Sequence, residues 1–313
     1  MTRVAAIDCG TNSIRLLVAD LDGRQGSLTD VERRMEVVRL GQGVDRSGRL
    51  APEALERTFT ACRHYAELVR ELGAERLRFV ATSATRDAAN RDEFVRGVRD
   101  VLGVDPEVVS GDEEAALSFA GATRELPAAG LPGPYLVVDI GGGSTEFVLG
   151  DASGVRAARS VDIGCVRMTE RHLHDDPPTA AQVAAARAEI DAAIELAAAV
   201  VPLGEARTLV GVAGSVTTVT AMVLGLAAYD PAAIHLARVG AEDVREATSR
   251  LLAMPREERA ALPFMHPGRV DVIGAGALVL VAVLDRVGPD RVGLDALVTS
   301  EHDILDGIAL SML

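Results

Sequence analysis

Short apolar runs alternate with longer stretches of helical periodicity along the first part of the chain. Apolar residues recur every three or four positions from Leu55 to Val69, which predicts a helix, and Gly73 follows where such a helix would end. The other predicted elements are strands over 4–8, 14–20, 76–82 and 107–109 and helices over 92–102 and from about 112. This alternation predicts an α/β domain in which helices cover a sheet.

A loop rich in proline and glycine over 127–134 marks the best domain boundary. After it the pattern restarts, with strands over 135–140, 146–150, 155–161, 208–214 and 292–298 and helices over 179–201, 241–253, 271–287 and 304–313. At about 150 residues per domain, a chain of 313 residues also suggests two domains. We expect them to cover residues 1–125 and 126–299.

Each half opens with the same turn between two strands. Asp8-Cys-Gly-Thr-Asn-Ser13 and Asp139-Ile-Gly-Gly-Gly-Ser144 share the form Asp-x-Gly-x-x-Ser, and each lies between two apolar runs. Two copies of one strand–turn–strand unit imply a duplicated α/β domain with a cleft between the copies.

Turns of this composition suit phosphate. Glycine lets an anion approach the backbone, N–H groups and hydroxyls point one way, and an aspartate at the strand end can bind Mg²⁺ or its waters. A single turn would be an ordinary hairpin, but a hairpin needs neither the Asp nor the Ser, so two matching copies favour phosphate binding. A third turn, Gly211-Val-Ala-Gly-Ser215, resembles a further phosphate or nucleotide contact through Gly214 and Ser215, although helix starts favour serine anyway.

Carboxylates at the start of one predicted helix have two interpretations. In Ser110-Gly-Asp-Glu-Glu114, Ser110 and Glu113 have the spacing of a capping box, and acidic residues suit a helix N-terminus. Capping leaves Glu114 without a structural role, and a carboxylate near a phosphate cleft could orient and deprotonate water. The spacing alone supports a catalytic residue and a helix cap equally. The hydroxyl-rich segment 81–90, which contains Arg86, is expected to be a polar loop.

The charge balance narrows the function classes. Acidic residues outnumber basic ones 46 to 32, a net charge of −14, which argues against binding to nucleic acid or to a membrane surface. The chain contains no lysine, so a lysine-dependent phosphate loop and Schiff-base chemistry are excluded. Arginines must therefore supply the positive charge for a polyanion, and those beside the motifs are Arg15, Arg86, Arg167 and Arg269. Scattered cysteines and the lack of a long apolar run predict a soluble, cytoplasmic protein.

The histidines give little reason to expect a metal centre. The segment Arg171-His-Leu-His-Asp-Asp-Pro-Pro178 lacks a distant partner set, and its proline pair is typical of a surface loop. His302 and Asp303 are expected to cap the final helix. Neither segment supports a histidine-aspartate metal phosphohydrolase domain.

In the order of its motifs the chain resembles the exopolyphosphatase / guanosine pentaphosphate phosphohydrolase (Ppx/GppA) family. The matching segments are IDCGTNSIRLLVAD, ATSATRDAAN, SGDEEA, VVDIGGGSTEFV, GVAGSVTT and RVDVIGAGA. The chain is most similar to the short, two-domain form of actinobacteria, whose C-terminal segment also reads SEHDILDGI. The resemblance implies the duplicated actin-like, ribonuclease-H-like fold of the sugar kinase, heat-shock chaperone and actin superfamily. It also implies an interdomain cleft and a C-terminal helix, within 300–313, that packs back on the first domain.

The resemblance implies roles for individual residues. Glu114 matches the general base that activates water, and Asp139 and Glu146 match acidic residues needed for activity and for Mg²⁺. We also expect Asp8 among the metal ligands and Mn²⁺ as an alternative ion. The substrate-binding residues that we expect are Asp8, Gly10, Thr11, Asn12, Ser13, Arg15, Arg86, Gly141, Gly142, Gly143, Ser144, Thr145, Gly214, Ser215 and Arg269.

Two positions depart from the family pattern. Thr11 stands where the family often has serine, and because the hydroxyl is kept we expect no loss of function. Near the C-terminus, Ser300-Glu-His-Asp-Ile-Leu-Asp-Gly307 replaces the commoner S-D-x-G-L-R-E-G and lacks its arginine. This second departure leaves the substrate preference open.

The predicted reaction is Mg²⁺-dependent hydrolysis of the terminal phosphoanhydride of linear inorganic polyphosphate, with a preference for short chains, to release orthophosphate. The same site could instead remove the terminal phosphate of guanosine pentaphosphate, and nucleotides could act as substrates or inhibitors. Two other functional classes stay open: a small-molecule kinase of the same superfamily and a non-catalytic nucleotide sensor. The SGDEEA segment argues against the kinase. The oligomeric state is not decided by the sequence, although the Ala-rich helix over 179–201 could serve a homodimer.

Overall fold

The computed structural model describes residues 1–23, 27–288 and 294–313. The chain forms two compact units, of which unit 1 comprises Met1–Gly121 together with Ile304–Leu313 and unit 2 comprises Ala122–Asp303. The chain thus passes between the units twice, a few residues from the boundaries that the sequence suggested at 125 and 299. In the described ranges, none of the helices combines the length and the apolar character that a membrane span requires.

The described part of unit 1 contains one mixed sheet in the order β3-β2-β1-β4-β5. Its strands are β1 (Thr2–Cys9), β2 (Ser13–Asp22), β3 (Ser27–Val37), β4 (Arg76–Ala81) and β5 (Glu107–Val108). The first three strands run antiparallel to one another, whereas β4 lies parallel to β1 and β5 parallel to β4. The carboxyl end of β1 and the turn that follows it therefore lie at the same edge of the sheet as the end of β4.

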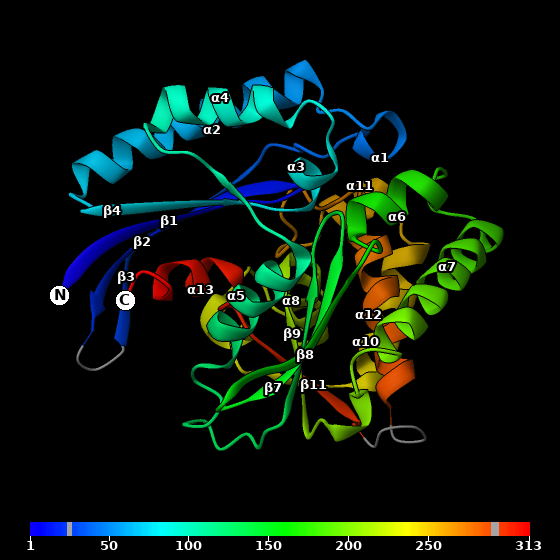
Figure 1. Cartoon of the computed structure of the whole chain (residues 1–313). Coiled ribbons are helices and arrows are strands. Elements are labelled where there is room, and N and C mark those ends of the chain that lie inside the picture. The colour runs from blue at the N-terminus through cyan, green and yellow to red at the C-terminus, as the bar shows by residue number, and fades with distance from the viewer. Residues whose placement is uncertain (24–26, 289–293) are drawn as a thin grey trace. The chain divides into compact units, whose positions relative to one another are not determined.

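Helices cover both faces of this sheet, which explains why its central strand β1 is buried from Val4 to Cys9. The helices of unit 1 are α1 (Val44–Ser47), α2 (Pro52–Glu71), α3 (Ser83–Asp87), α4 (Arg91–Leu102), α5 (Gly111–Thr123) and α13 (Ile304–Leu310). Ala5 and Ile7 point into a core shared with α2 and α4, while their neighbours Val4 and Ala6 point into a second core shared with α13. Figure 1 shows α2 and α4 on one side of the strands and α13 on the other.

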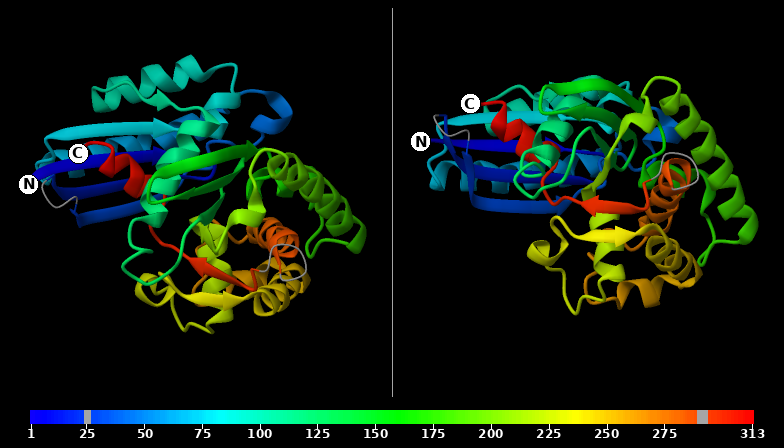
Figure 2. Two further views of the ribbon diagram at one scale, coloured as in Figure 1. Left: turned by 60° about the horizontal axis from the view of Figure 1, so that its bottom comes forward. Right: turned by 90° about the horizontal axis from the view of Figure 1, so that it is seen from below.

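The C-terminal helix α13 is tied to unit 1 by charge as well as by apolar contact. Arg33 on β3 donates to both carboxylate oxygens of Asp306, at 3.2 and 2.6 Å, and Asp306 is buried. Gly307 lies so close to α5 that a β-carbon there would be 1.9 Å from the carbonyl oxygen of Leu117. The last helix consequently fixes α5 in place, and both views in Figure 2 show it (red) along the strands of unit 1.

The described part of unit 2 contains a second mixed sheet, in the order β10-β11-β9-β6-β7-β8. Its strands are β6 (Tyr135–Ile140), β7 (Thr145–Asp151), β8 (Gly154–Val161), β9 (Thr208–Val212), β10 (Arg238–Gly240) and β11 (Ala296–Thr299). As in unit 1, three antiparallel strands are followed by a strand that lies parallel to the first, so β8-β7-β6-β9 repeats β3-β2-β1-β4. The internal duplication predicted from the two turns is confirmed.

Helices of unit 2 pack around α12, whose residues from Ile273 to Leu284 are all buried. The described helices are α6 (Cys165–His172), α7 (Ala180–Ala198), η1 (Leu203–Glu205), α8 (Ala213–Val223), α9 (Pro231–Ile234), α10 (Ala241–Ala253), α11 (Arg256–Ala260) and α12 (Ile273–Val287). One core joins α12 to the inner face of the sheet and to α7, α8 and α10. Beside this core, the turn after β6 is bonded to the start of α6, and Gly211 in β9 lies close to Val216 in α8.

Several elements differ from the sequence-based expectation. The strand β3 was not predicted, because its many charged residues lack the apolar pattern of the central strands and lie at the sheet edge. The polar segment after β4 forms the short helix α3 rather than a loop, and α6 extends through His172 into a segment that was expected to be a surface loop. Val292 and Gly293, predicted to begin the last strand, lie outside the described residues.

Candidate active site

In unit 2 the turn between β6 and β7 is held by hydrogen bonds to its carbonyl groups. The Gly141 N–H donates to the Ser144 carbonyl at 3.0 Å and closes the turn. The carbonyls of Gly141, Gly142 and Gly143 accept 2.8–3.2 Å bonds from N–H groups of the segment that begins α6. The helix start is therefore satisfied by the turn.

The N–H groups of this turn remain available. Among the described residues, those of Gly142, Gly143 and Ser144 donate to no protein acceptor. Successive N–H groups in such a turn make a concavity with positive potential that binds anions. The arrangement fits the phosphate loop predicted from the sequence. The Thr145 hydroxyl, by contrast, is buried and donates to the Ile163 carbonyl at 3.0 Å, so it serves the fold.

Gly164 allows the turn and α6 to approach each other, and the sequence reasoning missed it. A β-carbon on Gly164 would lie 2.3 Å from the carbonyl carbon and oxygen of Gly142. The contact is between two backbones, so neither side can rotate away as a side chain would. The φ of Gly164 is −79°, which does not itself require glycine, so the close contact with Gly142 accounts for the residue.

Asp139 and Glu146 form a pair of carboxylates beside this turn. They are directly opposite each other in the β6–β7 ladder, so their side chains share one face of the sheet. Both are almost fully buried, at 6% and 1% exposure, and the Ser160 hydroxyl donates to Glu146 Oε1 at 2.7 Å. Two opposed, buried carboxylates repel each other unless a cation or a proton joins them. Their oxygens are ligands that Mg²⁺ prefers.

Unit 1 carries the same turn with a different charge partner. The Gly10 N–H donates to the Ser13 carbonyl at 2.9 Å, as Gly141 does to Ser144. At the position equivalent to Glu146, however, stands Arg15, which donates to Asp8 Oδ2 from Nε at 3.0 Å and from Nη2 at 2.7 Å. The charge of Asp8 is thus balanced within the protein, whereas Asp139 faces a second acid.

Thr11 and Asn12 in the unit 1 turn are bonded to the segment behind the turn. The Thr11 and Asn12 carbonyls accept N–H bonds from the segment that follows β3. The Thr11 hydroxyl lies 2.8 Å from that of Ser83 and is buried, with its methyl group packed against Gly41. The side chain of Thr11 therefore belongs to the packing behind the turn, and only its backbone remains for a substrate.

The start of α5 separates its two glutamates. The predicted capping box is confirmed, because the Ser110 N–H and hydroxyl donate to Glu113 at 3.0 and 3.1 Å and the Glu113 N–H donates to Ser110 Oγ at 3.2 Å. These bonds hold the pKa of Glu113 below its usual value. Glu114 is buried instead and accepts from Arg86 Nη1 at 3.1 Å. The structure thus brings together Glu114 and Arg86, two residues singled out by the sequence.

The third turn places an arginine against a helix start. Arg269 lies across the backbone at the beginning of α8, because a β-carbon on Gly214 would be 2.3–2.4 Å from its guanidinium group. Arg269 Nη1 also donates to Thr218 Oγ1 at 3.3 Å. Ser215 is turned inward, since a β-carbon on Gly276 in α12 would lie 2.1 Å from its hydroxyl oxygen. Gly214 and Arg269 thus make one local unit, and a role of Ser215 in binding stays a prediction.

The histidines differ from expectation. His172 lies in α6 and is paired with Glu189 at 2.5 Å, so the segment after Arg171 is not simply a surface loop. His302, expected to cap the last helix, instead faces Glu125, and His235 faces the same carboxylate. These three side chains form a group that could hold a metal ion. No local spacing could have revealed it, because the three residues are far apart in the sequence.

The chain has close relatives among known proteins. Over its full length it is 56% identical to Exopolyphosphatase 2 of Mycobacterium tuberculosis, and the match covers 99% of that protein. It is 32% identical to the guanosine-5'-triphosphate,3'-diphosphate pyrophosphatase of Aeromonas salmonicida, over 93% of this chain and 56% of that longer protein.

Solved structures agree with the sequence relatives. An exopolyphosphatase-like protein superposes with a TM-score of 0.94 and 48% identity, covering 99% of this chain and 98% of the other. The PPX-GPPA enzyme of Aquifex aeolicus superposes with a TM-score of 0.80 and 29% identity, covering 99% of both chains. These likenesses confirm the predicted fold class. The model of the Ppx/GppA phosphatase family matches residues 17–312, and the chain belongs to that family.

Proposed function

We propose that this chain is an exopolyphosphatase that hydrolyses the terminal phosphoanhydride of linear inorganic polyphosphate and releases orthophosphate. The observation that carries the proposal is the turn from Gly141 to Ser144, which combines available N–H groups with the Asp139 and Glu146 carboxylates. The full-length identity to a protein named as an exopolyphosphatase supports the same substrate. Anionic oxygens would accept from the turn, and the carboxylates would recruit the cation that such a substrate carries.

Backbone N–H groups and arginine side chains bind the phosphate groups of the substrate. The N–H groups of the unit 2 turn bind phosphate oxygens, and the turn from Gly10 to Ser13 in unit 1 is a second phosphate-binding turn. Arg269, lying flat at the start of α8, supplies positive charge that a chain without lysine must take from arginine. Binding therefore depends on these few groups, since the net charge of −14 opposes a polyanion.

The residues present fit a divalent cation in unit 2. Asp139 and Glu146 would hold Mg²⁺, or Mn²⁺ in its place, through buried carboxylate oxygens on neighbouring strands. Asp8 fits this role less well because Arg15 already balances its charge. When bound, the ion neutralises the negative charge that develops on the departing phosphate group.

Glu114 accepts the proton of the attacking water. The water oxygen forms a bond to the terminal phosphorus, the bridging P–O bond breaks, and the shortened chain leaves as orthophosphate is formed. The 3.1 Å bond from Arg86, which is itself fixed by the Val109 carbonyl at 3.0 Å, orients the Glu114 carboxylate. Glu113 takes no part, because its carboxylate is committed to the cap of the same helix.

Guanosine pentaphosphate is the second candidate substrate. The family relatives named as guanosine-5'-triphosphate,3'-diphosphate pyrophosphatases, at 32% identity, favour it, and nucleotides could also inhibit by occupying the same phosphate site. Because the Aeromonas protein is much longer than this chain, features outside the shared part could determine its preference. We therefore place polyphosphate, of short chain length, first.

We also propose a cytoplasmic location and a homodimer. The three cysteines are free and buried, which suits the reducing cytoplasm where we place this activity. Leu196 on α7 and Val200, two residues beyond the end of that helix, are more than half exposed and offer apolar surface for a homodimer. Light scattering on the purified chain, with a Leu196→Glu variant, would test the dimer.

One experiment tests the function. Phosphate release is measured from polyphosphates of graded length and from guanosine pentaphosphate, with Mg²⁺ and with excess chelator. We expect release from polyphosphate that is lost in chelator and in Asp139→Asn, while Asp151→Asn, at the other end of β7, keeps the rate. Full activity in chelator would remove the metal from the proposal. A much faster reaction with guanosine pentaphosphate would support the alternative, and no release from any polyphosphate would refute the function.

A further inference from the structure

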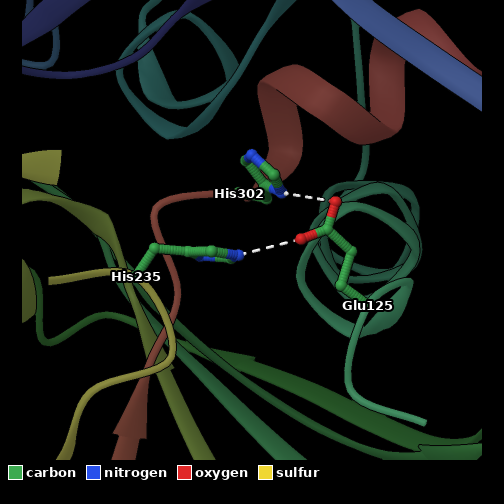
Figure 3. Close-up of side chains that lie close together, drawn as sticks. All are labelled: Glu125, His235 and His302. Carbon is green, nitrogen blue, oxygen red and sulfur yellow. Dashed lines mark hydrogen bonds and ion pairs between the residues drawn. The ribbon is translucent and has the colours of Figure 1, made fainter. Parts of the chain in front are cut away.

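Three side chains from distant parts of the sequence meet within unit 2. Glu125 follows α5, His235 directly follows α9, and His302 precedes α13. His235 Nε2 lies 3.0 Å from Glu125 Oε2, and His302 Nδ1 lies 3.7 Å from Glu125 Oε1. Figure 3 shows the carboxylate pointing toward both imidazole rings, whose centroids are 4.5 Å apart.

We propose that Glu125, His235 and His302 form a Zn²⁺ site that is separate from the Asp139–Glu146 pair. Two imidazole nitrogens and one carboxylate oxygen are a donor set typical of Zn²⁺ with an open coordination position. Mg²⁺ strongly prefers oxygen ligands and leaves such a set vacant, so the two ions would not compete for one place.

The geometry requires only small movements. Nitrogen and oxygen ligands at about 2.0–2.2 Å from a tetrahedral ion lie roughly 3.3–3.6 Å from one another. The separations of 3.0 and 3.7 Å join the two rings to the two different oxygens of Glu125, and one ligand atom from each residue lies within 4.8 Å of the others. Side-chain rotations of about 1 Å would bring one carboxylate oxygen and both nitrogens into that range. The side chains of His235, His302 and Glu125 are 20%, 32% and 40% exposed, so an ion can enter and water can complete its coordination.

Binding has one identifiable cost. The Glu301 N–H donates to His235 Nδ1 at 3.3 Å, which leaves the ring proton on Nε2 to be donated to Glu125. An ion at Nε2 moves that proton to Nδ1 and ends the bond from Glu301. At 3.3 Å this bond is longer than an ordinary N–H hydrogen bond, so its loss does not outweigh three metal ligands.

The position of the site gives the ion a structural role. The chain leaves unit 1 at Gly121 and returns to it at Ile304. Glu125 lies shortly after the first crossing, and His302 lies shortly before the second. Zn²⁺ would join these two segments to each other and to the His235 segment, and we expect it to stabilise unit 2 at the place where the chain crosses.

A binding titration tests the proposal. The full chain is titrated with Zn²⁺ against a chromogenic chelator in the presence of excess Mg²⁺, and thermal melting is followed with and without Zn²⁺. We expect one equivalent to bind and to raise the melting temperature, as ligands of the folded state do. His235→Gln and His302→Gln should each weaken binding at least about tenfold and abolish the shift. His174→Gln, an exposed histidine outside the cluster, is the matched control.

Zn²⁺ bound at this cluster should depend on both of its histidines and on neither His174 nor Asp139. Zn²⁺ affinity that survives in both His235→Gln and His302→Gln would overturn the proposal, and so would equal weakening in His174→Gln. Weakening by Asp139→Asn, or displacement of Zn²⁺ by Mg²⁺, would overturn it as well and assign the ion to the Asp139–Glu146 pair. Circular dichroism on each variant shows that it is folded, and because the rings are partly exposed at least one variant should pass this test.

Discussion

Glu113 and Glu114 are neighbours on α5, yet the structure gives them separate duties that one pair of variants can distinguish. Glu113 is bonded to Ser110 in the capping box, whereas Glu114 is buried and bonded to Arg86. Glu114→Gln keeps the size of the side chain and removes its ability to accept a proton. If Glu114 is the base, turnover should fall by about 10²–10⁴, the usual contribution of a positioned general base.

The two substitutions should change the free energy of unfolding by much less than Glu114→Gln raises the activation barrier. In Glu114→Gln the charged partner of Arg86 is lost, but Arg86 keeps its bond to Val109 and an amide oxygen can still accept, so we expect a cost of about 1 kcal/mol. In Glu113→Gln the amide can maintain the capping box, and the lost charge at the helix start costs about 0.3–1 kcal/mol. The variants should therefore melt similarly while their turnover differs greatly.

The pH dependence of stability gives a second test of the control variant, Glu113→Gln. The Ser110 N–H and hydroxyl lower the pKa of Glu113, so the ionised carboxylate stabilises the folded state above its unfolded value of 4.5. This contribution disappears as the pH falls through the folded pKa. Wild type should thus lose its advantage over Glu113→Gln in acid, as measured by denaturation at a series of pH values.

The assay combines phosphate release under single-turnover conditions, equilibrium binding of polyphosphate, and thermal melting. Polyphosphate should still bind to Glu114→Gln, and more tightly, because a negative charge is removed near an anion. Equal catalytic losses in the two variants would refute the reasoning, because only one of the glutamates has a carboxylate outside the cap. So would a Glu114→Gln protein that keeps its rate.

Three further predictions concern the groups that hold the site. Gly307→Ala places a methyl group against the Leu117 carbonyl, so stability should fall by about 1–3 kcal/mol together with turnover, measured by denaturation and phosphate release, with Gly204→Ala as a control in open space. Asp306→Asn should cost about 2 kcal/mol in denaturant unfolding because it leaves Arg33 without its buried partner. Arg269→Ala should raise half-saturation by polyphosphate more than it lowers turnover, and an unchanged half-saturation would count against this role.

Local sequence signals predicted the elements that local physics determines. The turns at Gly10 and Gly141 could be recognised because an aspartate, a glycine and a serine recur at fixed spacing between apolar strands, and the structure closes both with the same hydrogen bond. The capping box at Ser110 is equally local. Such features depend on a few consecutive residues, so their chemistry is visible before the chain is folded.

Features that depend on tertiary contacts could not be predicted in this way. The hydroxyl of Thr11 was expected to serve the phosphate loop, but packing commits it to Ser83, seventy-two positions further along the chain. The contact of Gly307 with Leu117 and the approach of Gly164 to Gly142 both depend on two backbones that meet only after folding. In each case the residue type is compatible with many environments, and only the fold selects one.

The two copies of the turn share a backbone and differ in charge, and this difference has a mechanistic consequence. At the same place in the two hairpins, Asp8 is paired with Arg15 and Asp139 with Glu146. An arginine beside an acid offsets its charge, whereas two opposed acids favour a cation between them. We therefore propose that the metal binds to the copy in unit 2, while the copy in unit 1 contributes N–H groups beside an internal ion pair. Asp8→Asn should consequently lower the free energy of unfolding, because Arg15 loses its charged partner Asp8. Asp139→Asn should instead change the concentration of Mg²⁺ that half-activates phosphate release.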